Sequence, residues 1–294
     1  MSKRFLDNVY DGENTVWHYI IVIGVVVLYW LLFAYLSMVV TQSLLESMGF
    51  HALIARMVSE AVPFAAVIGW LMLMLPELHE RSWQSLINAE STINYRRVAQ
   101  GFAVWGLQIS IFAGLAIADN PSHYSFNFDW QEWSLLLILS VCLVPIQTSA
   151  EELLFRGYLM QGLRLLTKHP LWLMSLTGLA FAIPHFGNPE MARGDFIWGA
   201  LDYFTWGVIF AMVTLKDNGL ELALGMHAAN NLFVYLFVTT PDSAVSSPAL
   251  FVYEQPIDPS FGFLGLLIEG AIFYAVFFGG IPRYKLGQRS ESSS

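Results

Sequence analysis

Charged residues are scarce in this sequence. Only 13% of the 294 residues are Asp, Glu, Lys or Arg, and 56% are hydrophobic, whereas a soluble domain carries roughly a quarter charged residues. This deficit indicates that lipid, rather than water, surrounds most of the protein surface. The longest apolar stretches contain about 20 residues, which is enough to cross the hydrocarbon core of a bilayer. The sequence therefore predicts an all-α, polytopic transmembrane bundle in a lipid bilayer.

Cysteine and basic residues are also few. The single cysteine, Cys142, excludes an internal disulfide and a thiolate metal cluster. Asp and Glu outnumber Lys and Arg by 23 to 14, which argues against a nucleic-acid partner. The residues before the first apolar stretch include Asp7, Asp11 and Glu13 rather than a purely basic run, so we expect no cleaved signal peptide.

The apolar stretches predict about eight spans, at 17–40, 58–75, 98–118, 131–148, 171–186, 196–215, 219–238 and 261–280. Residues 131–166 are too many for one crossing without a break, and Pro145 removes a backbone donor. We therefore expect the fourth crossing to run mainly from Pro145 to Leu166. The predicted organisation is an N-terminal segment at 1–16, a membrane domain at 17–282 and a polar tail at 283–294.

The basic residues are distributed unevenly between the expected loops. Twelve of the fourteen fall on the side of the eight spans that carries both termini. Because cytoplasmic loops are enriched in Lys and Arg, this asymmetry predicts that both termini are cytoplasmic. We expect an integral, multi-pass protein of a prokaryotic inner membrane.

The stretch TSAEELLFRGYL, residues 148–159, places three charges in apolar sequence: Glu151, Glu152 and Arg156. Charged side chains at membrane depth are unfavourable by about 2.5–3.5 kcal/mol each, so they face the bundle interior and pair. Glu152 and Arg156 are four residues apart and can form an ion pair along one helix. Glu151 is rotated by about 100° from Glu152, which leaves it free to face a cavity.

Two histidines in later spans are candidate partners of Glu151. Lys168 marks the expected turn between two antiparallel helices, and Glu151 and His185 lie at equal distances on either side of it. They can therefore face each other at one height, with Phe181 one turn before His185 as a wall of the cavity. In a later span, His227 is followed one turn on by an asparagine.

His227 and Asn231 are four residues apart and share one helix face. Asn230, three residues after His227, could take the place of Asn231 as the partner of His227. A carboxylate beside imidazoles suits general-base catalysis on water. A neutral amide donor suits stabilisation of an oxyanion. The predicted chemistry is hydrolysis of an amide bond inside the bilayer.

Structural roles remain open for these residues at this point. Glu152 and Arg156 can be only an ion pair at the membrane interface, and His185 can be a helix-terminal cap. His227 and Asn231 can be an interhelical hydrogen-bond pair. Three further acids in the spans are interpreted as structural or interfacial: Asp202, Glu221 and Glu269.

Three motifs in order, Glu151-Glu152-x-x-x-Arg156, Phe181-x-x-x-His185 and His227-x-x-x-Asn231, resemble those of the CAAX prenyl protease type II family, also called CPBP or Abi proteins. The family core would lie at about 145–240. The resemblance implies an intramembrane endopeptidase in which Glu151 and His185 activate water, and His227 and Asn231 form the oxyanion hole. Glu152 and Arg156 would support the site, and the substrate would be a membrane protein or a lipidated peptide.

The resemblance leaves the cofactor and one rival function open. We expect no metal; the zinc alternative would use Glu151, His185 and His227 as ligands, although the HExxH signature of zinc proteases is missing. The rival function is a non-proteolytic membrane scaffold or bacteriocin-immunity protein of the same fold. The presence of the complete catalytic set favours the enzyme.

Overall fold

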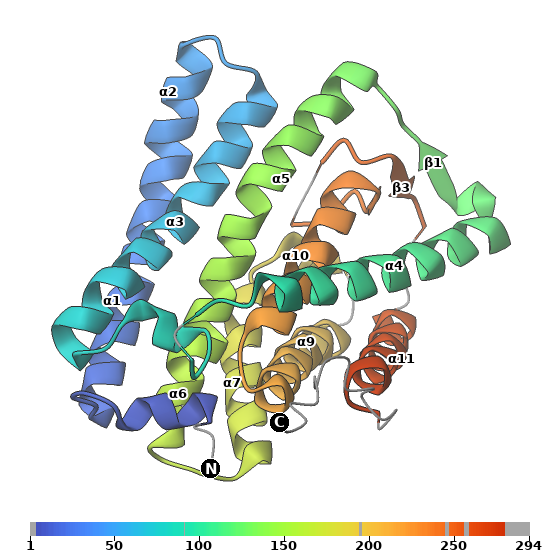
Figure 1. Cartoon of the computed structure of the whole chain (residues 1–294). Helices are drawn as coiled ribbons and strands as arrows, with labels where there is room; N and C mark the ends of the chain where they lie inside the picture. Colours follow the sequence, from blue (N-terminus) through green and yellow to red (C-terminus); the bar gives the residue numbers. More distant parts are fainter. Residues whose placement is uncertain (1–3, 91, 194–195, 245–246, 256–258, 280–294) are drawn as a thin grey trace, which may run out of the picture.

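Helices dominate the computed structural model, which describes residues 4–90, 92–193, 196–244, 247–255 and 259–279 (Figure 1). The α-helices are α1 Val16–Leu36, α2 Gln42–Ser47, α3 Ala52–His79, α4 Tyr95–Asp119, α5 Trp130–Glu152, α6 Met160–Arg164, α7 Pro170–His185, α8 Pro189–Arg193, α9 Phe196–Asp217, α10 Glu221–Leu236 and α11 Pro259–Phe278. Short 3-10 helices are η1 Phe5–Tyr10, η3 Trp83–Leu86 and η4 Pro121–His123, and π-helical segments are η2 Ser37–Thr41 and η5 Leu153–Leu159.

Six helical segments are long and apolar enough to cross a membrane: Val16–Ser47, Ala52–His79, Tyr95–Asp119, Trp130–Arg164, Phe196–Asp217 and Ser260–Phe278. The predicted all-α membrane bundle is confirmed. Two further expected spans, 171–186 and 219–238, coincide with α7 and α10, which have 16 residues each. The predicted count of eight spans is therefore not confirmed. The polar tail expected at 283–294 lies outside the described residues.

The break expected at Pro145 is absent. Helix α5 begins after Asp129, whose carboxylate accepts hydrogen bonds from the backbone N–H groups of Gln131 and Glu132 at 2.9 Å each. It then runs through Pro145 to Glu152 without interruption. The prediction was wrong because one lost backbone hydrogen bond is tolerated in a membrane helix that packs against neighbours, here α3 and α10. The irregular turn is the π-helical segment η5, which follows the two glutamates.

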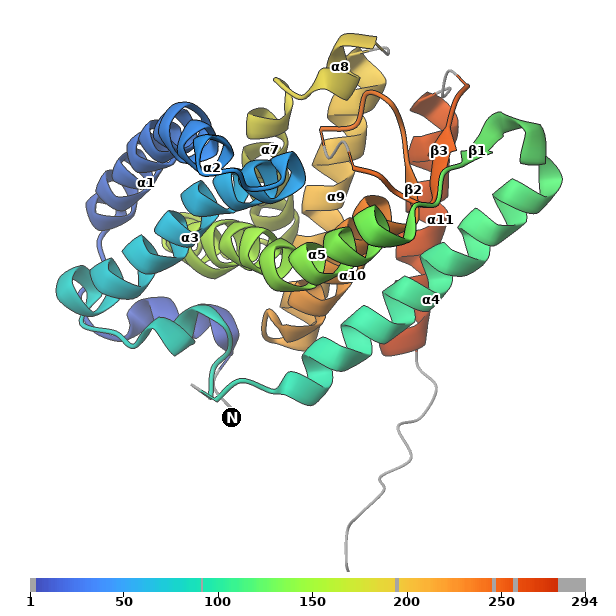
Figure 2. The same ribbon diagram turned by 90° about the horizontal axis from the view of Figure 1, so that it is seen from above.

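Close packing around α10 fixes the position of its polar residues. Helix α10 packs along α5 and is crossed by α4, while α7 packs against α9 and α1 against α3 (Figures 1 and 2). A Cβ atom on Gly225 of α10 would overlap the Val98 carbonyl oxygen of α4, and one on Gly101 of α4 would overlap the Leu222 carbonyl oxygen. Small residues at such crossings let helix backbones approach closely. The result is a close approach of the α10 backbone to the α4 backbone, while α10 also contacts α5.

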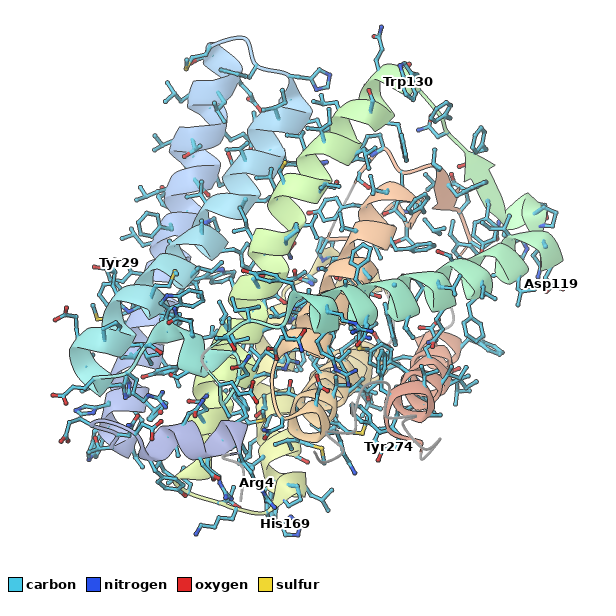
Figure 3. All side chains as sticks on the ribbon, in the orientation of Figure 1. Arg4, Tyr29, Asp119, Trp130, His169 and Tyr274 are labelled. Carbon is cyan, nitrogen blue, oxygen red and sulfur yellow. The ribbon has the colours of Figure 1, made fainter. Side chains whose placement is uncertain are left out.

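The two ends of the bundle differ in structure. Arg4 and His169 lie at the lower end in Figure 3, and Trp130 lies at the upper end. The N-terminal 3-10 helix η1 is packed into the lower end, where the side chains of Phe5 and Val9 are 1% exposed. Towards the other end, β3 Phe251–Tyr253 pairs antiparallel with β1 Tyr124–Phe126 and parallel with β2 Val238–Thr239. This small sheet anchors the chain that follows α10.

Candidate active site

The candidate residues gather at one cavity of about 1440 Å³. Side chains from α1, α3, α5, α7, α9 and α10 line it, together with the loops after α7 and α10. The lining includes six residues singled out in the sequence: Glu151, Phe181, His185, His227, Asn230 and Asn231. The sequence motifs, which are separated by up to 80 residues, therefore meet in space. Glu152 and Arg156 lie behind the cavity wall, with side chains that are 0% exposed.

The ion pair expected between Glu152 and Arg156 is present. Arg156 Nη1 donates to Glu152 Oε1 at 2.9 Å, and Arg156 Nη2 donates to the Gly207 carbonyl oxygen at 3.2 Å. The guanidinium also lies over the rings of Phe181 and Phe210, at 4.3 and 4.9 Å from their centroids. The pair is thus part of the buried core and not of the membrane interface.

The imidazole of His227 lies between the two glutamates. Its Nδ1 is 2.8 Å from Glu152 Oε1, and its Nε2 is 3.6 Å from Glu151 Oε2. Because Glu152 is paired with a guanidinium, its carboxylate accepts the hydrogen bond and Nδ1 donates. The second ring nitrogen is thereby directed at Glu151 and the cavity. This link between Glu152 and His227 was not predicted from the sequence.

The second histidine is oriented by a backbone contact. His185 Nδ1 donates to the Phe181 carbonyl oxygen at 2.7 Å, which leaves Nε2 as the ring nitrogen available to the cavity. The ring stacks on Tyr203 with a centroid distance of 4.4 Å. Within the described residues, His185 forms no hydrogen bond or ion pair with Glu151. The two side chains share the cavity as expected, but the imidazole nearest to Glu151 is that of His227.

The two asparagines are distinguished by their hydrogen bonds. Asn230 Oδ1 accepts from Trp105 Nε1 at 3.3 Å, and Asn230 Nδ2 donates to Asn231 Oδ1 at 3.2 Å. The amide nitrogen of Asn231 has no hydrogen-bond partner in the described part of the chain, so both of its N–H groups are available to the cavity. This arrangement favours Asn231 over Asn230 as a donor to a substrate.

Several lining residues had no signal in the sequence. The Tyr203 hydroxyl hydrogen-bonds with Glu190 and Asn188, and Glu190 Oε2 accepts from the backbone N–H of Ala244 at 2.9 Å. These contacts connect the ring beside His185 to the loop residues that line the cavity after α7 and α10. Tyr203 lies in an apolar run without a motif, and Glu190 lies in a short loop helix, so only the folded structure identifies them.

Two of the acids that were interpreted as structural, Glu221 and Asp202, lie in different environments. Glu221 is 4% exposed and accepts hydrogen bonds from the Asn88 side chain and the Asn94 backbone N–H, which agrees with a structural role. Asp202, in contrast, lines the cavity. That position was missed because a lone acid in an apolar helix does not indicate which side the helix turns inward.

The residues named for the zinc alternative, Glu151, His185 and His227, all line the cavity. Among the described residues, no group of three or more His, Cys, Asp or Glu side chains could hold a metal ion. The Nδ1 atoms of His185 and His227 are both engaged, by a backbone carbonyl and by Glu152. Their Nε2 atoms and Glu151 therefore remain the candidate donors, and His227 Nε2 lies 3.6 Å from Glu151 Oε2. We derive no catalytic step through a metal.

Comparisons with known proteins agree with the motif pattern. The model of the Rce1-like family, described as type II CAAX prenyl endopeptidase Rce1-like, matches residues 130–233. A relative named uncharacterized protein YyaK, from Bacillus subtilis (strain 168), is 35% identical over 259 residues, which cover 83% of this chain and 86% of the relative. No solved structure matches the chain.

Proposed function

The chain belongs to the Rce1-like family of type II CAAX prenyl endopeptidases, and we propose that it is an intramembrane endopeptidase with a glutamate-activated water. The observation that carries the proposal is the position of Glu151. Its carboxylate lines the cavity and lies 3.6 Å from His227 Nε2, while the adjacent Glu152 is fully buried with Arg156. One glutamate is therefore available for chemistry, and the other is held by the fold.

The proposed reaction uses Glu151 as general base. Glu151 takes a proton from a cavity water, and the water oxygen attacks the carbonyl carbon of the scissile peptide. The C–N bond then breaks, and the proton held by Glu151 passes to the leaving amine. His185, through Nε2, orients the water. His227, held by Glu152, keeps its Nε2 directed at Glu151.

Stabilisation of the tetrahedral oxyanion is the second requirement. We assign this role to the free N–H groups of Asn231, because the amide of Asn230 is already bound to Trp105 and Asn231. In its doubly protonated form, His227 adds a second donor. Since no step passes through a metal, chelation followed by addition of zinc should leave turnover unchanged.

The proposed substrate is a membrane protein or a lipidated peptide, with prenylated peptides as one class. Apolar side chains of α1 and α3 form one wall of the cavity, including Val27, Trp30 and Phe64, and such a wall suits an apolar segment or a lipid chain. The distribution of Lys and Arg supports a cytoplasmic location for the end that carries the N terminus. The complete catalytic set favours proteolysis over a scaffold role.

The function is tested by cleavage with the purified full chain in nanodiscs. A farnesylated CAAX peptide and a defined library of apolar peptides are incubated with the wild type, Glu151→Gln and Glu132→Gln, and products are identified by mass spectrometry. Glu132 is the matched control because it does not line the active-site cavity. We expect cleavage by the wild type and Glu132→Gln only. Equal product from Glu151→Gln, or none from the wild type, would contradict the proposal.

A further inference from the structure

Acidic side chains are numerous in the lining of the active-site cavity. Six acidic residues line it: Glu60, Glu151, Glu190, Asp202, Asp242 and Glu254. Among the described side chains, no Lys or Arg lines it. In a water-poor cleft, charges of one sign focus the field and favour ligands of the opposite sign. The cavity is therefore suited to a cationic substrate, and the question is which acid is available to bind it.

Most of these acids already have partners. Glu60 lies 3.8 Å from Arg56 Nε, and Glu190 accepts from Tyr203, Asn188 and Ala244. Glu254 accepts from the hydroxyl of Ser125 at 2.7 Å. A substrate cation would displace no existing hydrogen bond or ion pair at an acid that has no such contact.

Asp202 is such an acid. In the described part of the chain, no hydrogen bond or ion pair engages its carboxylate, which interacts electrostatically with another acid, Glu269, and with Tyr203. Asp202 lies in α9, one of the candidate membrane spans. An ionisable side chain at membrane depth normally has a partner of opposite charge and marks a functional site. The residues that the structure describes supply no such partner to Asp202.

The position of Asp202 connects it to the proposed chemistry. Its neighbour Tyr203 stacks on His185 at 4.4 Å between ring centroids, and all three residues line the same cavity. A cation bound to Asp202 would thus lie in the cavity that holds the proposed catalytic residues, beside the ring that stacks on His185.

We propose that the cavity selects an apolar peptide segment that carries a lysine or arginine near the scissile bond, and that Asp202 binds this cation. The proposal rests on the peptidase function, and it specifies the substrate class. A segment cleaved next to its free C-terminal carboxylate would instead bring a negative charge to a lining that offers no lysine or arginine among the described side chains. Among apolar segments, prenylated ones included, a basic residue near the scissile bond is therefore favoured over a negatively charged group at that place.

The test measures binding and does not require turnover. Four dansyl-labelled peptides share one apolar sequence: three C-terminal amides with Lys, Gln or Glu at the centre, and the Gln peptide with a free carboxylate. Affinities are measured by fluorescence on the purified full chain in nanodiscs of zwitterionic lipid, so that lipid charge does not contribute. We expect the Lys peptide to bind about tenfold or more tighter than the Gln amide, and the Glu peptide and the free carboxylate to bind more weakly.

Variants of Asp202 then test whether this carboxylate binds the cation. Asp202→Asn, which keeps the side-chain shape, should reduce the preference for Lys over Gln to less than about twofold, whereas the control Glu132→Gln should keep it. Asp202→Glu restores the charge and should restore part of the preference. Equal binding of the Lys and Gln peptides by the wild type would overturn the proposal, and so would an unchanged preference in a folded Asp202→Asn. The wild-type comparison decides the charge preference even where the variant does not fold.

The outcomes separate the two levels of inference. Peptide cleavage that depends on Glu151, with equal affinity for all four peptides, would retain the peptidase function and reject the cationic substrate. Tight binding of the Lys peptide without any cleavage in a broad library would retain the charge preference and count against the peptidase function.

Discussion

The buried group formed by Arg156, Glu152 and His227 makes a quantitative prediction. Glu152→Met removes the acceptor of two hydrogen bonds, from Arg156 Nη1 at 2.9 Å and from His227 Nδ1 at 2.8 Å. Arg156 is 0% exposed and would keep only the Gly207 carbonyl oxygen as acceptor. Leaving a buried charge without its partner costs about 3–5 kcal/mol. We therefore expect this single substitution, and equally Arg156→Met, to destabilise the protein severely.

The double variant Glu152→Met/Arg156→Met separates stability from catalysis. Replacing both members of a buried ion pair by apolar side chains of similar volume is often neutral or stabilising. The double variant should thus regain most of the stability that either single variant loses. Peptidase activity should not return, because His227 Nδ1 still has no carboxylate to hold it.

Two measurements check this pair of expectations. Thermal unfolding of the detergent-purified protein should show both single variants melting roughly 6–20 °C below the wild type, if the loss per kcal/mol follows that of globular domains of similar size. Nitrogen-15 NMR of labelled histidine should show a proton on His227 Nδ1 in the wild type, and a changed signal in the double variant. Single variants as stable as the wild type, or a fully active double variant, would refute this account of the site.

Three further predictions concern single contacts. Asn231→Ala should lower kcat by a factor of about 10²–10³, as for loss of an oxyanion donor, while Asn230→Ala should lower it less. Steady-state kinetics that show the larger loss of kcat in Asn230→Ala would instead assign the oxyanion role to Asn230. Tyr203→Leu should lower kcat by removing the ring stacked on His185, and Tyr203→Phe should retain most activity, so equal losses would show that the hydroxyl matters more than the ring. Gly225→Ala should lower the free energy of unfolding by about 1–3 kcal/mol by overpacking the α4–α10 crossing. The expected result is a lower Tm, and adding Glu151→Gln to this variant should abolish cleavage as it does in the wild type.

Local patterns in the sequence were sufficient for part of this structure. The four-residue spacing predicts the Glu152–Arg156 pair because both side chains leave the same helix face. The rotation of Glu151 away from Glu152 predicts that it faces a different environment, and the structure places it at the cavity. These predictions depend only on helix geometry, which does not change with the packing of the bundle.

Contacts between helices were outside the reach of such patterns. The hydrogen bond from His227 to Glu152 joins residues 75 positions apart, and it depends on how closely α10 approaches α5. That approach is set by the packing of whole helices, including glycines such as Gly225 at the α4 crossing. The break predicted at Pro145 was wrong for the same reason. The local effect of proline predicts a break, but the packing of α5 against α3 and α10 keeps the helix continuous.

The adjacency of the two glutamates has a geometric reason. Consecutive side chains on a helix point about 100° apart, so Glu151 can enter the cavity while Glu152 enters the core beside Arg156. His227 contacts both carboxylates, through Nε2 and Nδ1. One rigid imidazole thus spans the angle between two neighbouring side chains, and moving either glutamate by one position would remove a contact at one end of the ring. Aspartate at either position would be shorter by one methylene group, so glutamate at both positions follows from the geometry of this histidine.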